Sequence, residues 1–230
     1  MLPNFASLDD LLVHGESMWN VFSQLEEAAT TTAALLSTSG TSGLPKAAAH
    51  SHKSFIHQVT ALNDSAKKPY EVGSVSFIAG LHSIDAENVQ VFRLLALPVF
   101  HAFMFPLAHL LPLLQGTPTY IMRRYELTKF LDHIYDYGIT ETALVPTIVA
   151  KILKSDLKPH RLLRSLRMVI CAGSTLPQLT QRDFYRLLRP NVRLIQCWGM
   201  TEACWITTLL YPEKDHTGSV GRLLPGFEAK

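Results

Sequence analysis

The chain has 230 residues, of which 47% are hydrophobic and 17% are charged. This composition excludes an intrinsically disordered chain, and the length is sufficient for one large domain with a substantial core. The formal net charge is only +2, so it gives no reason to expect a nucleic acid or an anionic membrane as partner.

Hydrophobic spacing predicts strands and helices that alternate along the chain. Strands are expected at residues 33–38, 94–100, 119–122, 142–145, 168–171 and 192–196. Helices are expected at residues 51–63, at 127–135 with Gly138 after the end, from Pro146 onward, and at 176–188. Residues 66–90 are the least regular part and are interpreted as a surface excursion. The alternation is typical of βαβ units, so we predict an α/β fold with a largely parallel sheet.

One apolar stretch, residues 94–114, is long enough to suggest a membrane span. It contains three prolines and two histidines, so we expect a buried strand followed by a buried helix instead. Residues 1–16 lack the features of a secretory signal. Cys171, Cys197 and Cys204 are odd in number and fit no zinc spacing, which favours a reducing compartment, and we expect a cytoplasmic protein.

The strongest functional signal is the string STSGTSGLPK at residues 37–46, directly after the first predicted strand. Gly40 and Gly43 allow the backbone to turn tightly and present N–H groups to an anion. Hydroxyl side chains add uncharged donors, and Lys46 supplies a point charge suited to phosphate. The string is not a Walker A loop, because Ala47 rather than Ser or Thr follows the lysine. These features fit a polyphosphate cradle, with a flexible Ser/Gly surface turn as the alternative.

A second polar segment follows the last predicted strand, at the edge where open α/β sheets bind ligands. Trp198 offers an aromatic face for adenine, Thr201 a hydroxyl for a phosphate, and Glu202 a hard oxygen ligand for Mg²⁺. Taken alone, these residues are equally compatible with a buried aromatic turn that carries a solvent-facing glutamate.

Both segments resemble signatures of the adenylate-forming enzymes, a family that includes acyl-CoA synthetases, 4-coumarate–CoA ligases, luciferases and the adenylation domains of peptide synthetases. SGTSGLPK at residues 39–46 resembles the family's SGTTGLPK, and QCWGMTE at 196–202 resembles QGYGMTE. Segments similar to other family blocks follow the family's order: PVFH at 98–101, VPT at 145–147, CAGS at 171–174 and GSVG at 218–221. The resemblance favours the phosphate-loop interpretation and implies the α/β fold of the family's large domain.

The resemblance also implies a role for individual residues. The nucleotide would be bound by Thr38, Ser39, Gly40, Thr41, Ser42, Gly43, Lys46, Gly173, Ser174, Trp198, Gly199 and Thr201. Glu202 would hold Mg²⁺, and the catalytic candidates are Thr201, Glu202 and His101. His101 would contact the acid or the acyl-adenylate, with a hydrogen-bonded core histidine as the alternative. Cys197 stands where the family commonly has Gly, and Thr175 where it usually has Pro, so the shape of the pocket differs from the family pattern.

The implied reaction joins a carboxylic acid to ATP with loss of pyrophosphate, after which coenzyme A attacks the acyl-adenylate. In the peptide-synthetase adenylation domains that the chain resembles, an Asp in the segment matching residues 100–103 holds the substrate ammonium. Residues 100–103 contain no carboxylate here, so the resemblance implies an aryl or fatty acid rather than an amino acid. We therefore predict the ATP-binding core of an ATP-dependent acid–thiol ligase. The alternatives are a non-catalytic nucleotide-binding remnant, the adenylation part of a larger synthetase, or a structural fragment without a ligand.

Family members are much longer than this chain. Residues 1–32 are therefore expected to be a lead-in left from an N-terminal subdomain, and residues 33–230 an adenylation core that is incomplete at both ends. The small C-terminal domain, which in the family carries a lysine that assists adenylation, is expected to lie beyond residue 230. The sequence predicts no oligomeric state.

Overall fold

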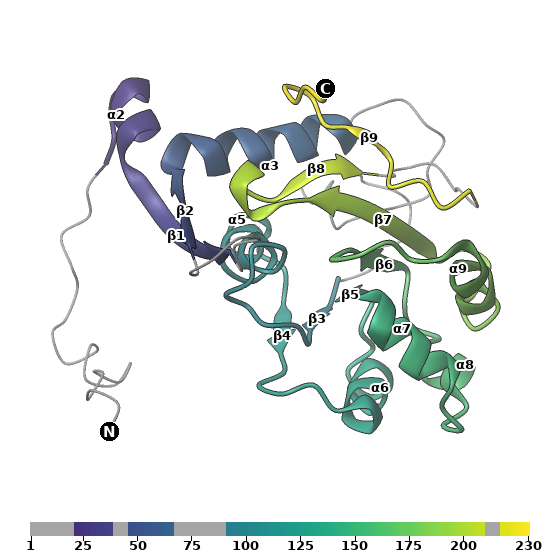
Figure 1. Cartoon of the computed structure of the whole chain (residues 1–230). Coiled ribbons are helices and arrows are strands. Elements are labelled where there is room, and N and C mark those ends of the chain that lie inside the picture. The colour runs from purple at the N-terminus through teal and green to yellow at the C-terminus, as the bar shows by residue number, and fades with distance from the viewer. Residues whose placement is uncertain (1–20, 39–45, 67–90, 210–216) are drawn as a thin grey trace, which may run out of the picture.

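The computed structural model describes residues 21–38, 46–66, 91–209 and 217–230 (Figure 1). The first part contains helix α2 (Leu25–Thr30), strands β1 (Thr32–Thr38) and β2 (Lys46–Ser51), and helix α3 (His52–Ala66). The middle part contains β3 (Arg93–Leu95), the π-helix η1 (Pro106–Leu110), α5 (Leu111–Gln115), β4 (Thr119–Ile121), α6 (Leu127–Asp136), β5 (Glu141–Leu144), α7 (Pro146–Leu153) and α8 (Pro159–Leu162). The last part contains β6 (Met168–Cys171), α9 (Gln178–Tyr185), β7 (Arg193–Gly199), the 3₁₀ turn η2 (Thr201–Ala203), β8 (Ile206–Leu209) and β9 (Arg222–Leu223).

The main sheet has seven strands in the order β4-β3-β5-β6-β7-β8-β9. Pairing is parallel from β4 to β7 and antiparallel at β7–β8 and β8–β9. A separate antiparallel hairpin joins β1 to β2, with Thr38 opposite Lys46. The predicted α/β fold with a largely parallel sheet is therefore confirmed, and the antiparallel hairpin and the two antiparallel edge strands are additions to it.

Two apolar clusters cover the two faces of the parallel strands, because successive side chains of a strand point to opposite faces. On one face, Leu94, Leu144 and Val169 pack with helices α6, α7 and α9. On the other, Leu95, Ala143 and Ile170 pack with α3, η1, α5 and β8. The sheet is thus the middle of three layers, with α6 to α9 on one side and α3 on the other (Figure 1).

Most predicted elements occur within one or two residues of their expected bounds, and four depart from them. The strand expected at 94–100 ends at Leu95, because Pro98 has no N–H for a ladder and instead accepts the His101 N–H in a turn, at 3.1 Å. The helix expected at 176–188 is the shorter α9. Strand β7 extends to Gly199, because β8 pairs with its end. Helix α3 runs to Ala66, three residues beyond its expected end. Strands β2, β8 and β9 and helices α2 and α8 were not predicted.

The apolar stretch at residues 94–114 forms the end of β3, η1 and most of α5. The helix is less buried than predicted, since Leu113 and Leu114 are exposed. Across the described ranges, no helix is both long enough and apolar enough to cross a bilayer.

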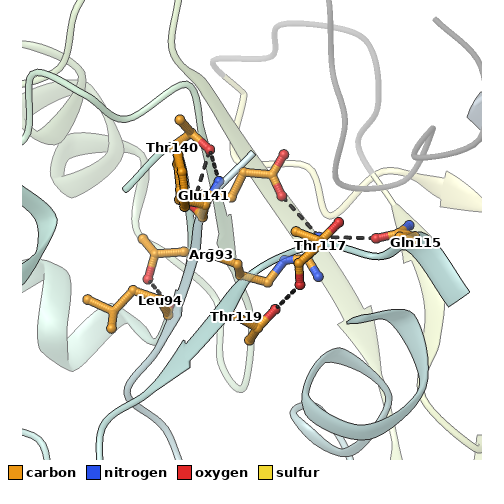
Figure 2. Close-up of polar contacts among 9 residues, drawn as sticks. Arg93, Leu94, Gln115, Thr117, Thr119, Thr140 and Glu141 are labelled. Atoms are coloured by element: carbon orange, nitrogen blue, oxygen red, sulfur yellow. Dashed lines mark hydrogen bonds and ion pairs between the residues drawn. The ribbon is translucent and has the colours of Figure 1, made fainter. Parts of the chain in front are cut away.

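A buried ion pair ties β3 to β5 near the end of α5 (Figure 2). The Arg93 guanidinium donates to the Glu141 carboxylate at 3.1 Å and to the Gln115 side-chain oxygen at 3.3 Å. Both charged side chains are 2% exposed or less. Burial lowers the pKa of Arg93, and the Glu141 charge opposes that change. The pair lies on the α3-side face of the sheet, because Arg93 and Leu95 point the same way along β3.

Candidate active site

One cleft of about 560 Å³ is lined by residues from segments that lie far apart in the sequence. It is lined by Ser37, Thr38, Lys46, His101, Ala102, Phe103, Ala172, Gly173, Cys197, Gly199, Met200, Thr201, Glu202, Trp205 and Ile206. The size is typical of a small-molecule site. Seven of the predicted site residues are therefore brought together: Thr38, Lys46, His101, Gly173, Gly199, Thr201 and Glu202.

The β1–β2 hairpin places the two ends of the predicted phosphate loop at this cleft. Thr38 closes β1, Lys46 opens β2, and the two are paired across the hairpin. Ser39, Gly40, Thr41, Ser42 and Gly43 lie outside the described residues. Thr38 and Lys46 thus line the same cleft as Thr201 and Glu202.

The segment after β7 makes a tight turn that presents Thr201 and Glu202. The η2 turn is closed by Ala203 N–H donating to the Met200 carbonyl at 3.1 Å and by Cys204 N–H donating to the Thr201 carbonyl at 3.2 Å. Cys204 has φ 77°, a conformation that costs a residue with a side chain energy. The strained residue lies directly after the η2 turn, where the chain reverses direction before β8.

Gly199 is required because the backbone of the returning strand lies against it. A Cβ on residue 199 would overlap the Trp205 carbonyl oxygen and would lie 3.1 Å from the Ile206 Cα. The register of β7 with β8 also shifts between Trp198 and Gly199. Such irregularities next to a site redirect side chains, and here they bring Trp205 and Ile206 to the wall of the cleft.

The His101 imidazole is exposed and oriented by its own turn. The Phe103 backbone N–H donates to His101 Nδ1 at 3.1 Å. Because Nδ1 accepts this bond, the neutral ring carries its proton on Nε2, which is then the atom able to donate. The exposure does not fit the alternative of a core histidine.

Gly173 reaches the cleft through a turn held against β7. The Leu176 N–H donates to the buried Gln196 side-chain oxygen at 3.1 Å, and Gly173 has φ 86°. Ser174 and Trp198, in contrast, do not line the cleft. Trp198 lies in β7 at 48% exposure, with its backbone N–H donating to Thr208 Oγ1 at 3.3 Å. These two predicted nucleotide contacts are therefore not among the seven predicted site residues that line the cleft.

The apolar part of the cleft is formed by Phe103, Cys197, Trp205 and Ile206. Burial raises the pKa of the Cys197 thiol, so it is a neutral apolar wall at physiological pH. Trp205 and Ile206 were missed by the sequence reasoning. The residues that follow a Thr-Glu turn carry no periodic signal, and β8 becomes evident only through its pairing with β7.

A second cleft of about 610 Å³ lies on the other side of the η2 turn. Glu202 lines both clefts, and Ala203 and Cys204 line only the second. Its opposite wall comes from β2 and α3, where His50 and Gln58 are buried. The turn that carries Glu202 therefore lies between the first cleft and a second cleft whose far wall includes α3.

Comparison with known proteins gives the family. The sequence model of the AMP-binding enzymes matches residues 7–230. The chain belongs to the AMP-binding enzyme family. Two relatives from Aspergillus niger, an acyl-CoA ligase, azaF, and a phenylacetyl-CoA ligase, epaB, are each 40% identical over 223 residues. In both cases the alignment covers 96% of this chain and 38% of the relative, so the chain spans well under half the length of these AMP-binding enzymes.

Solved structures of AMP-binding enzymes have the same fold. O-succinylbenzoate coenzyme A synthetase from Bacillus subtilis, in complex with ATP and magnesium ion, matches with a TM-score of 0.64 at 23% identity. The match covers 86% of this chain and 36% of that protein. At this identity the likeness shows the arrangement of the α/β layers, and the roles of individual residues rest on the geometry of the cleft.

Proposed function

We propose that this chain is the nucleotide- and acid-binding core of an ATP-dependent acid–thiol ligase, with coenzyme A as the co-substrate. The observation that carries the proposal is the single cleft shared by Thr38, Lys46, Thr201 and Glu202. A cation, hydroxyl donors and a hard carboxylate oxygen are the groups that a magnesium-bound triphosphate requires. The names of the relatives, which are acyl-CoA and phenylacetyl-CoA ligases, support the same reaction class.

Each group then has a distinct task. Lys46 and the flanking Thr38 hold the terminal phosphates, and Thr201 donates to the α-phosphate. Glu202 is the residue suited to Mg²⁺, which supplies charge neutralisation on the phosphates when bound. His101 is proposed to donate its Nε2–H to the acid or to the acyl-adenylate. These residues act mainly by fixing the reacting groups and by countering the charge that develops on the phosphate oxygens.

The acid is proposed to occupy the apolar part of the cleft. Phe103, Cys197, Trp205 and Ile206 offer hydrophobic and aromatic surface, and none carries a charge. Among the described residues that line the cleft, Glu202 is the only one with a carboxylate, and it is assigned to the metal. An aryl or fatty acid fits such a wall better than an amino acid, whose ammonium would have no dedicated partner.

The nucleotide part of the proposal is tested with Lys46→Ala, measured by calorimetry in the presence of Mg²⁺. A charge-assisted contact to phosphate contributes about 1.5–3 kcal/mol, so ATP affinity should fall by about 10- to 100-fold. AMP affinity should change little, because the proposed partner of Lys46 is a terminal phosphate. Lys151→Ala, an exposed lysine of α7 away from the cleft, is the control. Equal losses for ATP and AMP would contradict the role of Lys46.

A second candidate is a nucleotide-binding chain without turnover. The observation in its favour is that Lys46 is the only lysine or arginine among the described residues that line the cleft, so only one basic side chain there can stabilise the charge of the transition state. Losing one group that stabilises transition-state charge typically costs about 100- to 1000-fold in rate. Pyrophosphate release with phenylacetate and hexanoate separates the two candidates. Acid-dependent release identifies a ligase, whereas ATP binding without release identifies a non-catalytic binder.

A further inference from the structure

A buried glutamine of α3 is bonded to the strand that forms the apolar wall of the cleft. The Gln58 side-chain Nε2 donates to the Ile206 carbonyl oxygen at 2.7 Å, and the two residues are 148 positions apart in the sequence. Gln58 is 3% exposed and Ile206 is 2% exposed. A carbonyl oxygen only accepts hydrogen bonds, so chemistry fixes the orientation of the amide. The contact is therefore a specific bond between α3 and β8.

The backbone that Gln58 holds is fixed on its other side by Gly199. The Trp205 carbonyl lies too close to the Gly199 Cα for any side chain to fit between them. Ile206 is paired with Gly199 in the β7–β8 ladder. Residues 205–206 are thus placed between β7 and α3, which runs alongside β8 (Figure 1). Both residues line the proposed acid site, so a shift of this backbone would change the width of that site.

The chemistry of Gln58 does not fit a purely stabilising role. Within the described part of the chain, its Oε1 atom is buried and has no hydrogen-bond partner. An unsatisfied buried oxygen costs stability, so an apolar side chain of similar length would serve packing alone at least as well. What an apolar side chain does not provide is a directed bond that fixes the position of the Ile206 carbonyl.

We propose that Gln58 is a positioning residue of the acid site, which sets the location of the Trp205–Ile206 wall and thereby the affinity for the acyl group. The inference rests on the proposed function, because it assumes that this wall contacts the acid. Gln58 is not among the residues that line the cleft proposed for the nucleotide and the metal. Its loss should therefore weaken binding of the acyl part and leave binding of the nucleotide part unchanged.

The test is Gln58→Met, which keeps the length of the side chain and removes the donor. Binding of AMP and of two non-hydrolysable acyl-adenylate analogues, phenylacetyl- and hexanoyl-sulfamoyladenosine, is measured by calorimetry on the full chain. Loss of one buried hydrogen bond is expected to weaken the tighter analogue by about five- to tenfold, with AMP affinity unchanged within about twofold. The melting temperature should shift by no more than about 4 °C, because the unsatisfied oxygen is removed with the donor.

Gln181→Met is the matched control. Gln181 is a buried glutamine of α9, on the opposite face of the sheet, and it lines neither cleft. This variant should leave the ratio of analogue to AMP affinity unchanged, whatever its effect on the melting temperature. The inference is overturned if Gln58→Met preserves that ratio, or if it weakens AMP and the analogues equally. If neither analogue binds the unaltered chain more tightly than AMP does, the proposed function and the inference both fail.

Discussion

Alanine at position 199 is expected to disturb both the stability of the chain and the cleft. A Cβ at Gly199 would overlap the Trp205 carbonyl oxygen, and would lie 2.9 Å from the Trp205 carbonyl carbon and 3.1 Å from the Ile206 Cα. All of these are backbone atoms, so no side chain can rotate away. Gly199 does not have a positive φ, so space alone requires the glycine.

These contacts set the loss in the free energy of unfolding that Gly199→Ala would cause. Carbon atoms are relaxed at about 3.5 Å, so β7 and β8 would have to separate by at least about half an ångström. Overpacking of this kind costs about 1–3 kcal/mol, and a weakened ladder bond adds about 1 kcal/mol. We therefore expect Gly199→Ala to lower the free energy of unfolding by about 2–4 kcal/mol. Affinity for the acyl-adenylate analogues should fall as well, because the Trp205–Ile206 wall moves with β8.

The assay is urea denaturation followed by far-ultraviolet circular dichroism. Gly116→Ala is a suitable comparison, because Gly116 has φ 62° and a Cβ at that position would meet no atom within 4 Å. That variant should lose about 1–2 kcal/mol from backbone strain alone, with no effect on ligands. The reasoning would be refuted by a Gly199→Ala chain as stable as the Gly116→Ala chain and with unaltered ligand affinity.

Three further predictions concern stability. The free energy of unfolding, measured by urea denaturation, should be about 1 kcal/mol higher for Cys204→Gly than for Cys204→Ala, because only glycine adopts a φ of 77° without strain. An alanine variant that is more stable than the glycine variant would contradict the strain at this residue. Glu141→Leu should cost about 3–5 kcal/mol by leaving the buried Arg93 charge without its carboxylate, and adding Arg93→Met should recover much of that loss in a double-mutant cycle. Burial raises the pKa of Cys171 to about 12 and that of Cys204 to about 11, from 9.0. The thiols ionise first in the unfolded chain, so their contribution to stability should be unchanged well below pH 9 and should fall as the pH rises above 9, which thermal melts from pH 7 to 11 would measure.

The sequence by itself determined the elements whose signal is local. Helix α6 was predicted because its apolar residues recur at helical spacing and Gly138 follows its end, and α7 because Pro146 suits a first helical turn. The two polar segments were found because their residue types are rare together and match a family pattern. Thr38 and Lys46 of the first segment line the same cleft as Thr201 and Glu202 of the second, although β1 belongs to the separate hairpin and not to the main sheet.

Only the tertiary structure decided which residues form the walls of that cleft. Strands β2 and β8 exist through antiparallel pairing with a neighbour, and short stretches of this kind carry no periodicity of their own. Trp205 and Ile206 therefore line the cleft although no sequence signal pointed to them. Trp198 was predicted to be in the site but does not line the cleft, because β7 continues through that position. The bond from Gln58 to Ile206 likewise depends on the packing of α3 against β8. Contacts between distant segments arise from packing between layers, which no local pattern of side chains specifies.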